Sequence, residues 1–256
     1  MTPVSVNAAA GIGRITLDRP GQMNAVNVEL GVELERAILA FGSDPTIHVI
    51  VIRGAGGNFC AGGDFGEVER LRALGPSALR SLFVSFRRAC DAISAIDLPV
   101  VAAVEGVAAA GGFELMQAAD IVLVSDDARI SDNHIRFGMI PGGGSTQRLP
   151  RLIGRQQAMG VLLSGDRLSG ADAARLGLAY RSFPPDHFDD EVEQFVSAMA
   201  GRDRGALTAI KQLVISGLQQ PAASGLDDEI TEVVRHISEG AGRNGASAFN
   251  ERGGNR

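Results

Sequence analysis

Short apolar runs separated by polar turns mark the strands of this chain. Segments 48–52, 98–104 and 121–124 are rich in β-branched and other apolar residues, which predicts strands buried on both faces, as in a parallel sheet. Segment 12–17 is also predicted to be a strand, because it ends at the turn-forming residues Asp18-Arg19-Pro20-Gly21.

A different spacing, with apolar residues every three or four positions, predicts two amphipathic helices between these strands. The first follows Asn27, a favourable N-cap, and ends at Gly42-Ser43-Asp44-Pro45; the second lies between Pro76 and Ile96. Asp64 is placed to cap a further helix. Because strand and helix alternate up to about residue 180, we expect an α/β fold.

The pattern changes after Phe183-Pro184-Pro185. Beyond this break the sequence predicts helices with acidic and arginine-rich faces, followed by a polar, glycine-rich tail at 251–256. We therefore expect two parts, an α/β core at 1–188 and a helical C-terminal region at 189–256.

Composition narrows the class of protein. An apolar fraction of 45% excludes a disordered chain, and a net charge of −6 disfavours sequence-independent binding to nucleic acid. No apolar run is long enough to span a membrane, and residues 1–14 lack the pattern of a signal peptide. The two cysteines, Cys60 and Cys90, lie far apart, which suits a reducing compartment. We expect a cytoplasmic protein with neither a membrane nor nucleic acid as partner.

Several cofactor motifs are absent. The dinucleotide fingerprint G-x-G-x-x-G follows none of the predicted strands, and a phosphate loop is excluded because the single lysine, Lys211, is not in one. The four histidines show no metal-ligand spacing. We expect no metal and no separate cofactor.

Two glycine pairs follow predicted strands, Gly62-Gly63 and Gly111-Gly112. Glycine pairs expose consecutive backbone N–H groups, and at the start of a helix such groups favour a negative oxygen. Loops that follow parallel strands meet at the edge of the sheet where ligands bind. An alternative interpretation is that both pairs are only tight turns.

Glu114 is an acid in an apolar helix, since its neighbours include Phe113, Leu115 and Met116. Either its carboxylate lies on one exposed stripe, or it is partly buried with a raised pKa suited to proton transfer.

Five segments together resemble the crotonase superfamily, the enoyl-CoA hydratase/isomerase family. They are Arg19-Pro20 with Asn24-Ala25, Phe59-Cys60-Ala61-Gly62-Gly63-Asp64, Gly111-Gly112-Phe113-Glu114-Leu115, the segment from Ile140-Pro141-Gly142 to Thr146-Gln147-Arg148-Leu149, and Ala248-Phe249. Their order and spacing match the family over nearly the whole chain.

The resemblance implies a spiral of βαβ turns with a C-terminal helical region that helps to form trimers or hexamers. It implies an acyl-CoA thioester as substrate, with coenzyme A as part of that substrate. It also implies that the N–H groups of Gly63 and Gly111 form an oxyanion hole for the thioester oxygen. The residues that it places near the substrate are Asn24, Ala25, Ala61, Gly62, Asp64, Gly112, Pro141 and Gly142.

The residues expected to act as acid and base differ from the family pattern at one position. A hydratase of this family has two glutamates; the first corresponds to Glu114, and the second corresponds to His134, with Asp132 two residues away. Histidine serves as a general acid or base near neutral pH. Alternatively, His134 is only a loop residue and Asp132 only caps a turn.

We therefore expect reversible hydration of a 2-enoyl-CoA, with Glu114 as proton donor or base and His134 or Asp132 as the partner that orients water. Alternatives are an isomerase, a thioesterase or a C–C bond hydrolase that uses one glutamate, or a catalytically weak homologue that serves in binding or assembly. Retention of Glu114 and both glycine turns argues against the last.

Arginine is the expected partner of the coenzyme A phosphates, because lysine is missing from the matching places. Candidates are Arg19, Arg53 and Arg252, which would otherwise be solvated surface residues. The side chains that could line an acyl pocket, or could instead be core residues, are Leu71, Leu74, Leu82, Phe83 and Phe137.

Overall fold

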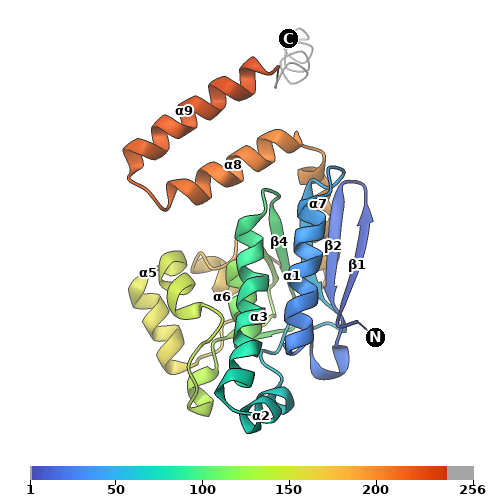
Figure 1. Cartoon of the computed structure of the whole chain (residues 1–256), viewed down its shortest axis with the longest axis vertical. Helices are drawn as coiled ribbons and strands as arrows, with labels where there is room; N and C mark the ends of the chain where they lie inside the picture. The colour runs from blue at the N-terminus through green and yellow to red at the C-terminus, as the bar shows by residue number, and fades with distance from the viewer. Residues whose placement is uncertain (1, 241–256) are drawn as a thin grey trace. The chain divides into compact units, whose positions relative to one another are not determined.

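The computed structural model describes residues 2–240 (Figure 1). By its internal contacts the chain divides into two compact units, Met1–Gly201 and Arg202–Arg256. The strands, all in the first unit, are β1 (Val4–Ala9), β2 (Ile12–Leu17), β3 (Val49–Gly54), β4 (Val100–Val104), β5 (Val107–Ala109), β6 (Ile121–Ser125), β7 (Arg129–Ser131) and β8 (Arg181–Phe183).

The helices of the first unit are α1 (Val28–Gly42), α2 (Phe65–Ala73), α3 (Pro76–Ala95), α4 (Gly111–Ala118), α5 (Ser145–Ser164), α6 (Gly170–Arg175) and α7 (Phe188–Ala200). Three short 3₁₀ helices join them, namely η1 (Pro20–Gln22), η2 (His134–Phe137) and η3 (Pro185–His187). The predicted caps are present, since the side chain of Asn27 accepts a hydrogen bond from the amide of Leu30, and that of Asp64 from the amide of Glu67.

A six-stranded sheet with the order β1-β2-β3-β4-β6-β8 forms the centre of this unit. Strands β2, β3, β4, β6 and β8 pair in parallel, as the apolar runs predict, whereas β1 pairs antiparallel with β2. The sequence did not predict β1. Five of its six residues are exposed, so its place depends on hydrogen bonds to β2 rather than on an apolar pattern.

Alternate residues of each central strand face two separate hydrophobic clusters. Ile50 and Ile52 of β3 belong to the cluster that includes residues of α1, α3 and α4, while Val49 and Val51 belong to the cluster that includes α7. Helices α1 and α3 lie side by side on the first face (Figure 1). The centre of the sheet is therefore covered on both faces, which is why β3, β4 and β6 are rich in apolar residues.

Helix α7 belongs to the first unit, so the boundary predicted at 188 is too early. Its residues Phe188, Val192, Val196 and Ala200 are buried in the second cluster against the sheet, and the unit extends to Gly201. The sequence predicted a helix here correctly but could not show that its apolar face covers the sheet.

The described part of the second unit consists of α8 (Arg204–Gly217) and α9 (Ala222–Ser238), which pack against each other. The sequence elements Ala248-Phe249 and Arg252 and the polar tail lie outside the described residues. Between residues 2 and 240, no helix combines the length and the apolarity that crossing a membrane requires.

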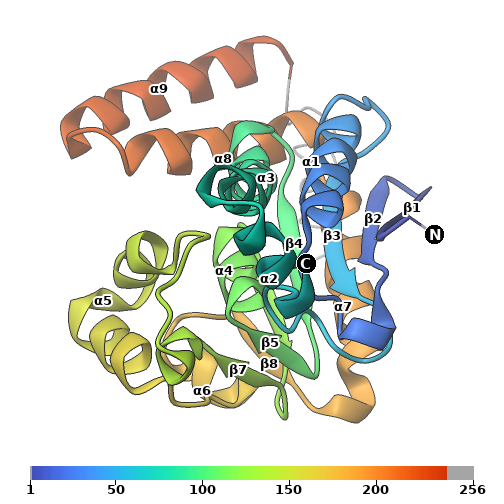
Figure 2. The same cartoon turned by 60° about the horizontal axis from the view of Figure 1, so that its bottom comes forward.

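A second parallel sheet consists of two strands, β5, which lies between β4 and α4 in the chain, and β7, which follows β6 (Figure 2). The sequence suggested that α4 directly follows strand 98–104, but β5 intervenes and pairs with β7. Strands of three residues are too short to show a period. An isolated bridge between Cys60 and Ala108 joins β5 to the loop after β3. This bridge brings the two glycine turns together.

Candidate active site

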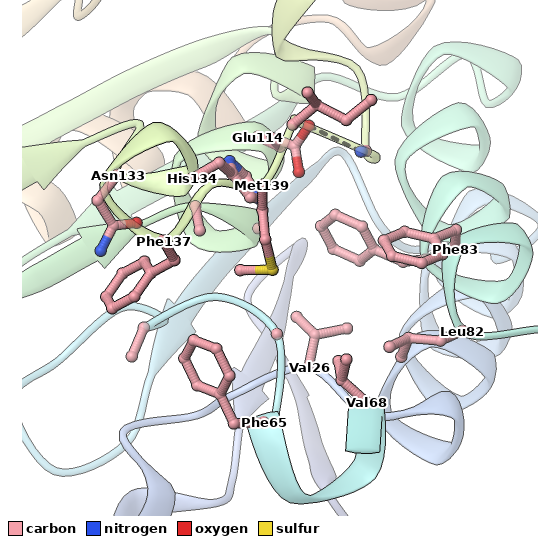
Figure 3. A pocket seen from close by; sticks show the side chains of 17 residues that line it. Val26, Phe65, Val68, Leu82, Phe83, Glu114, Asn133, His134, Phe137 and Met139 are labelled. Carbon is pink, nitrogen blue, oxygen red and sulfur yellow. Dashed lines mark hydrogen bonds between the residues drawn. The ribbon is translucent and has the colours of Figure 1, made fainter. Parts of the chain in front are cut away.

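A cavity of about 140 Å³ lies where the two glycine turns, α2, α3 and η2 meet (Figure 3). Most of its lining is apolar, and Figure 3 shows Phe65 and Phe137 on one side and Leu82 and Phe83 on the other. The polar side chains that line it are those of Glu114, Asn133 and His134. A cavity with apolar walls and a few convergent polar groups is typical of a small-molecule site.

The glycine turns are in direct contact at this cavity. A Cβ atom placed on Gly62 would lie 3.3 Å from the amide nitrogen of Gly111, and one placed on Gly111 would lie 3.7 Å from the amide nitrogen of Gly63. Gly62 has a φ of +106°, which a side chain rarely tolerates. The close approach depends on the missing side chain at Gly62, where a Cβ would lie 2.7 Å from the Cβ of Ala110, whereas at Gly111 a Cβ would make only ordinary contacts.

The amides of Gly63 and Gly111 are available to a ligand. Gly111 is the first residue of α4, where an N–H group has no partner within the helix. Neither amide donates to a backbone carbonyl among residues 2–240, and both residues line the cavity. Ala110, directly before, has a φ of +47° and a ψ of −114°, a strained conformation of the kind that clusters at functional sites.

Glu114 is buried, with 2% of its surface exposed, and its carboxylate is held in place by backbone groups. Its Oε1 accepts hydrogen bonds from the amides of Gly143 at 2.7 Å and Ser145 at 3.1 Å. Figure 3 shows the other carboxylate oxygen directed toward the cavity. Burial raises the pKa of Glu114 above its usual range, although the two amides and nearby His134 oppose the rise.

The segment that holds Glu114 is itself fixed by two side chains that the sequence analysis missed. Arg148 donates from Nη1 to the carbonyl of Gly143 at 2.6 Å, and Gln117 donates from Nε2 to Oγ of Ser145 at 3.0 Å. Arg148 belongs to the quoted motif, and Gln117 lies three residues after Glu114. The motif could have indicated a role for Arg148, and the spacing of three residues along the helix could have indicated that Gln117 lies near Glu114.

His134 lines the cavity together with Glu114, whereas Asp132 does not line it. Asp132 is 1% exposed, and its Oδ1 lies 2.6 Å from Nδ1 of His134. Burial alone would lower the pKa of His134, but the hydrogen bond to Asp132 and the charges of Asp132 and Glu114 raise it overall. Of the two partners predicted for Glu114, the structure therefore places His134 at the cavity.

Of the expected substrate-binding residues, only Ala61 lines the cavity directly, beside Gly63 and Gly111. Asn24 is fully buried and donates to the carbonyls of Ala55 and Asn58, which fixes the neighbouring loop.

The neighbours of these residues also support the loops rather than line the cavity. The carbonyl of Ala25 accepts from Arg19, and Arg19 pairs with Asp64 at 2.8 Å. Gly112 permits close packing, because a Cβ there would lie 2.0 Å from the carbonyl oxygen of Cys60.

Pro141 and Gly142 line a neighbouring surface hollow with Arg87, Asp91 and Arg148. Of the five apolar candidates, Leu82, Phe83 and Phe137 line the cavity, whereas Leu71 is a core residue and Leu74 is 66% exposed.

The arginines predicted to meet phosphate are otherwise engaged, as far as the described residues reach. Arg19 pairs with Asp64, and Arg53 pairs with Glu105 at 3.0 Å and Asp189 at 2.7 Å. Within residues 2–240, no group of His, Cys, Asp and Glu side chains is arranged to hold a metal ion.

A protein-family model described as "Enoyl-CoA hydratase/isomerase" matches residues 7–255 of the chain. The chain belongs to this family. A probable enoyl-CoA hydratase of Rhizobium meliloti is 33% identical over 221 residues, which cover 86% of this chain and 84% of the relative. The mitochondrial enoyl-CoA hydratase of Pongo abelii is 34% identical over 215 residues, which cover 84% of this chain and 72% of the relative.

Two further matches extend the comparison. A peroxisomal Delta(3,5)-Delta(2,4)-dienoyl-CoA isomerase of Arabidopsis thaliana is 28% identical over 231 residues, covering 86% of this chain and 83% of the relative. The crystal structure of an enoyl-CoA hydratase of Bacillus anthracis superposes with a TM-score of 0.92 at 28% identity, covering 98% and 96% of the two chains. The fold is therefore the crotonase fold, and membership of the family implies an acyl-CoA substrate.

Proposed function

We propose that the chain catalyses the reversible addition of water to the double bond of a 2-enoyl-CoA, giving a 3-hydroxyacyl-CoA. The observation that carries this proposal is that Glu114 and His134 line the same cavity as the amides of Gly63 and Gly111. Two groups that exchange protons then lie beside two groups that bind a negative oxygen.

The amides of Gly63 and Gly111 would bind the carbonyl oxygen of the thioester. When the oxygen of water bonds to C3, the electrons of the double bond move toward that carbonyl oxygen, and an enolate forms. Donors that are already in place for this charge stabilise the transition state, by roughly 3–4 kcal/mol each in related acyl chemistry.

Glu114 and His134 would divide the proton transfers between them. One takes a proton from water as the C3–O bond forms, and the other gives a proton to C2 as the enolate collapses. Burial raises the pKa of Glu114 from its ordinary value toward neutral pH, and Asp132 and Glu114 raise the pKa of His134 against the effect of its burial, which favours its charged, proton-donating form. A proton-transfer group works best when its pKa lies near the working pH.

A second candidate is migration of the double bond along the acyl chain. The same two side chains could move a proton from one carbon to another without water, and one relative is named as a dienoyl-CoA isomerase. The hydratase proposal has more support, because the relatives from Rhizobium meliloti and Pongo abelii are both named as hydratases at higher identity.

We place the protein in a homotrimer or hexamer of this chain. Supporting this assembly, α8 and α9 carry many large apolar side chains that are more than 40% exposed in the single chain: Ile210, Val214, Leu226, Ile230, Val233, Val234 and Ile237. Apolar surface of this extent favours burial against another chain.

Mass spectrometry of the products from a series of 2-enoyl-CoA and 3-enoyl-CoA substrates separates the candidates. Hydration adds the mass of one water, isomerisation leaves the mass unchanged, and thioester hydrolysis releases free coenzyme A. The proposal predicts the hydrated product from at least one 2-enoyl-CoA. A product of unchanged mass from every substrate would favour the isomerase instead.

A further inference from the structure

The contact between Asp132 and His134 assigns a distinct task to each residue. We propose that Asp132 is a positioning residue whose carboxylate holds the Nδ1–H of His134, so that Nε2 is the ring nitrogen that exchanges protons in the cavity. Asp132 itself does not touch the substrate. The predicted effect on kcat rests on the proposed function, whereas the tautomer and the titration of the His134 ring can be measured without any assumption about the reaction.

The first support is geometric. Oδ1 of Asp132 lies 2.6 Å from Nδ1 of His134 and 3.4 Å from the backbone amide of the same residue. A carboxylate only accepts at such a contact, so Nδ1 must carry the proton whether the ring is neutral or charged. Nε2 is therefore the only nitrogen of the ring that can exchange a proton. Because His134 lines the cavity, this exchange would take place there.

The second support is the energetic cost of Asp132. The residue is 1% exposed, and among the described residues its Oδ2 is buried without a hydrogen-bond partner. An unpaired buried polar atom destabilises a fold by about 1–3 kcal/mol, and more if it is charged. A residue that served only stability would be better as a neutral side chain. The carboxylate is instead placed where its charge acts on His134.

The charges that face His134 come from two elements. Asp132 lies in the loop before η2, and Glu114 comes from α4; both favour the charged ring, while burial disfavours it. Because Asp132 is the only one of these that contacts His134 by a hydrogen bond in the described structure, replacing it with a neutral isostere should lower the pKa of His134 and free the ring to change tautomer.

Nuclear magnetic resonance of isotopically labelled histidine tests the ring directly. The chain has four histidines, His48, His134, His187 and His236, and the spectrum of His134→Gln identifies the signal that belongs to His134. In the wild-type protein we expect the neutral ring to carry its proton on Nδ1. In Asp132→Asn we expect titration at a lower pH and a larger share of the other tautomer.

Asp166→Asn is the matched control. Asp166 is exposed and pairs with Arg136 of η2 at 3.8 Å, so this change removes one negative charge near the same helix without touching His134. It should leave the titration of His134 where it is in the wild type. An equal shift in both variants would mean that general charge, rather than the contact with Asp132, sets the state of the ring, and would overturn the proposal.

Kinetics provide the second readout. Asp132→Asn should lower kcat by roughly 10-fold or more, the lower end of the range for carboxylates that orient metal-binding or catalytic histidines, with a much smaller change in KM. The limb of the pH profile that reports His134 should move to lower pH. In a His134→Gln background the same change should have no further effect, because the two residues act as one unit.

The outcomes separate this proposal from the proposed function. If the wild type hydrates no enoyl-CoA but the Asp132→Asn spectrum changes as expected, the hydratase proposal fails and the role of Asp132 stands. If hydration is observed but Asp132→Asn leaves the tautomer, the titration and the pH profile unchanged, the role of Asp132 is wrong. A loss of rate that persists in the His134→Gln background would also contradict it.

Discussion

Oε1 of Glu114 accepts the amide proton of Gly143 at 2.7 Å, a contact between residues 29 positions apart in the chain. It fixes the carboxylate of α4 against the loop that leads into α5, and leaves the second oxygen to the cavity (Figure 3). The position of the candidate acid or base therefore depends on a backbone segment that contributes no reactive side chain.

Gly143→Ala should disturb this arrangement. The added Cβ would lie 2.5 Å from the ring of Phe86 and 2.8 Å from Oε2 of Glu114, so both side chains, or the backbone at position 143, must shift. We expect kcat for hydration to fall by at least ~10-fold, with a loss of stability of about 1–3 kcal/mol from overpacking. Steady-state kinetics and thermal unfolding measure both effects.

Gly160→Ala is the control for that variant. Gly160 lies in α5, the helix that follows the loop of Gly143, and a Cβ there would meet nothing within 4 Å. The change should leave kcat unaltered and should stabilise the helix by roughly 0.5–1 kcal/mol. Equal kinetics for the two variants would show that the segment at Gly143 does not position Glu114.

Glu114→Gln should stabilise the folded protein at neutral and alkaline pH. Burial raises the pKa of Glu114 in the folded state above the ordinary value of 4.5, so ionisation of the carboxylate costs folding free energy as the pH rises through the folded pKa. Glutamine stays neutral and avoids this cost. Thermal unfolding at about pH 8 should occur at a higher temperature in the variant, and the difference should shrink as the pH falls toward 4.5. A wild type that is more stable at about pH 8 would contradict the assigned environment of Glu114.

His134→Gln should destabilise the folded protein, and most strongly at acidic pH. The pKa of His134 is raised above its ordinary value of 6.5, so the stability contributed by the charged ring is fully present below pH 6.5 and is lost as the pH rises through the folded pKa. The variant should therefore be less stable than the wild type at about pH 6, and the gap should narrow at about pH 9. Unfolding curves in denaturant at the two pH values measure it. A gap that widens toward alkaline pH would mean that the charged ring is not favoured.

Phe83→Ala should change the preference for acyl chains. The ring of Phe83 lines the cavity and is 41% exposed, so its removal widens the site without opening the main core. We expect kcat/KM for long or bulky enoyl chains to rise relative to crotonyl-CoA by about 10-fold or more, since small changes in pocket volume discriminate by this order. Competition assays with paired substrates measure the ratio.

Leu39→Ala serves as the control for Phe83→Ala. Leu39 has a similar exposure, 42%, but lies in α1 and does not line the cavity. Leu39→Ala should leave the ratio of kcat/KM for long enoyl chains to kcat/KM for crotonyl-CoA unchanged. If both variants give the wild-type ratio, Phe83 does not determine the choice of chain.

The sequence was informative wherever burial imposes a pattern on the residues. Strands β3, β4 and β6 were predicted because both of their faces are covered, and α1 and α3 because one face of each packs on the sheet. Strand β1 was missed because most of its residues are exposed. The boundary predicted at 188 was wrong because the pattern of α7 identifies a helix but not the surface that it covers.

The candidate site was predictable where function requires a particular residue type. Glycine at positions 63 and 111 and an acid at 114 are visible in the sequence, and the structure brings all three to one cavity. Whether His134 or Asp132 faces that cavity depends on the conformation of the loop before η2. A loop has no regular spacing of apolar residues, so the sequence could not decide between them. The amides of Gly143 and Ser145 that hold Glu114 are backbone groups, so no residue type identifies them.

The origin of the hydroxyl oxygen tests the central claim most directly. A 2-enoyl-CoA is incubated with the wild-type protein or with Glu114→Gln in water labelled with heavy oxygen, and the product is analysed by mass spectrometry. The account predicts label at C3 of a 3-hydroxyacyl-CoA from the wild type, with a rate lower by roughly 10²–10⁴-fold in the variant and substrate binding retained. A wild-type protein that transfers no label to C3 of any enoyl-CoA, or a variant as fast as the wild type, would contradict it.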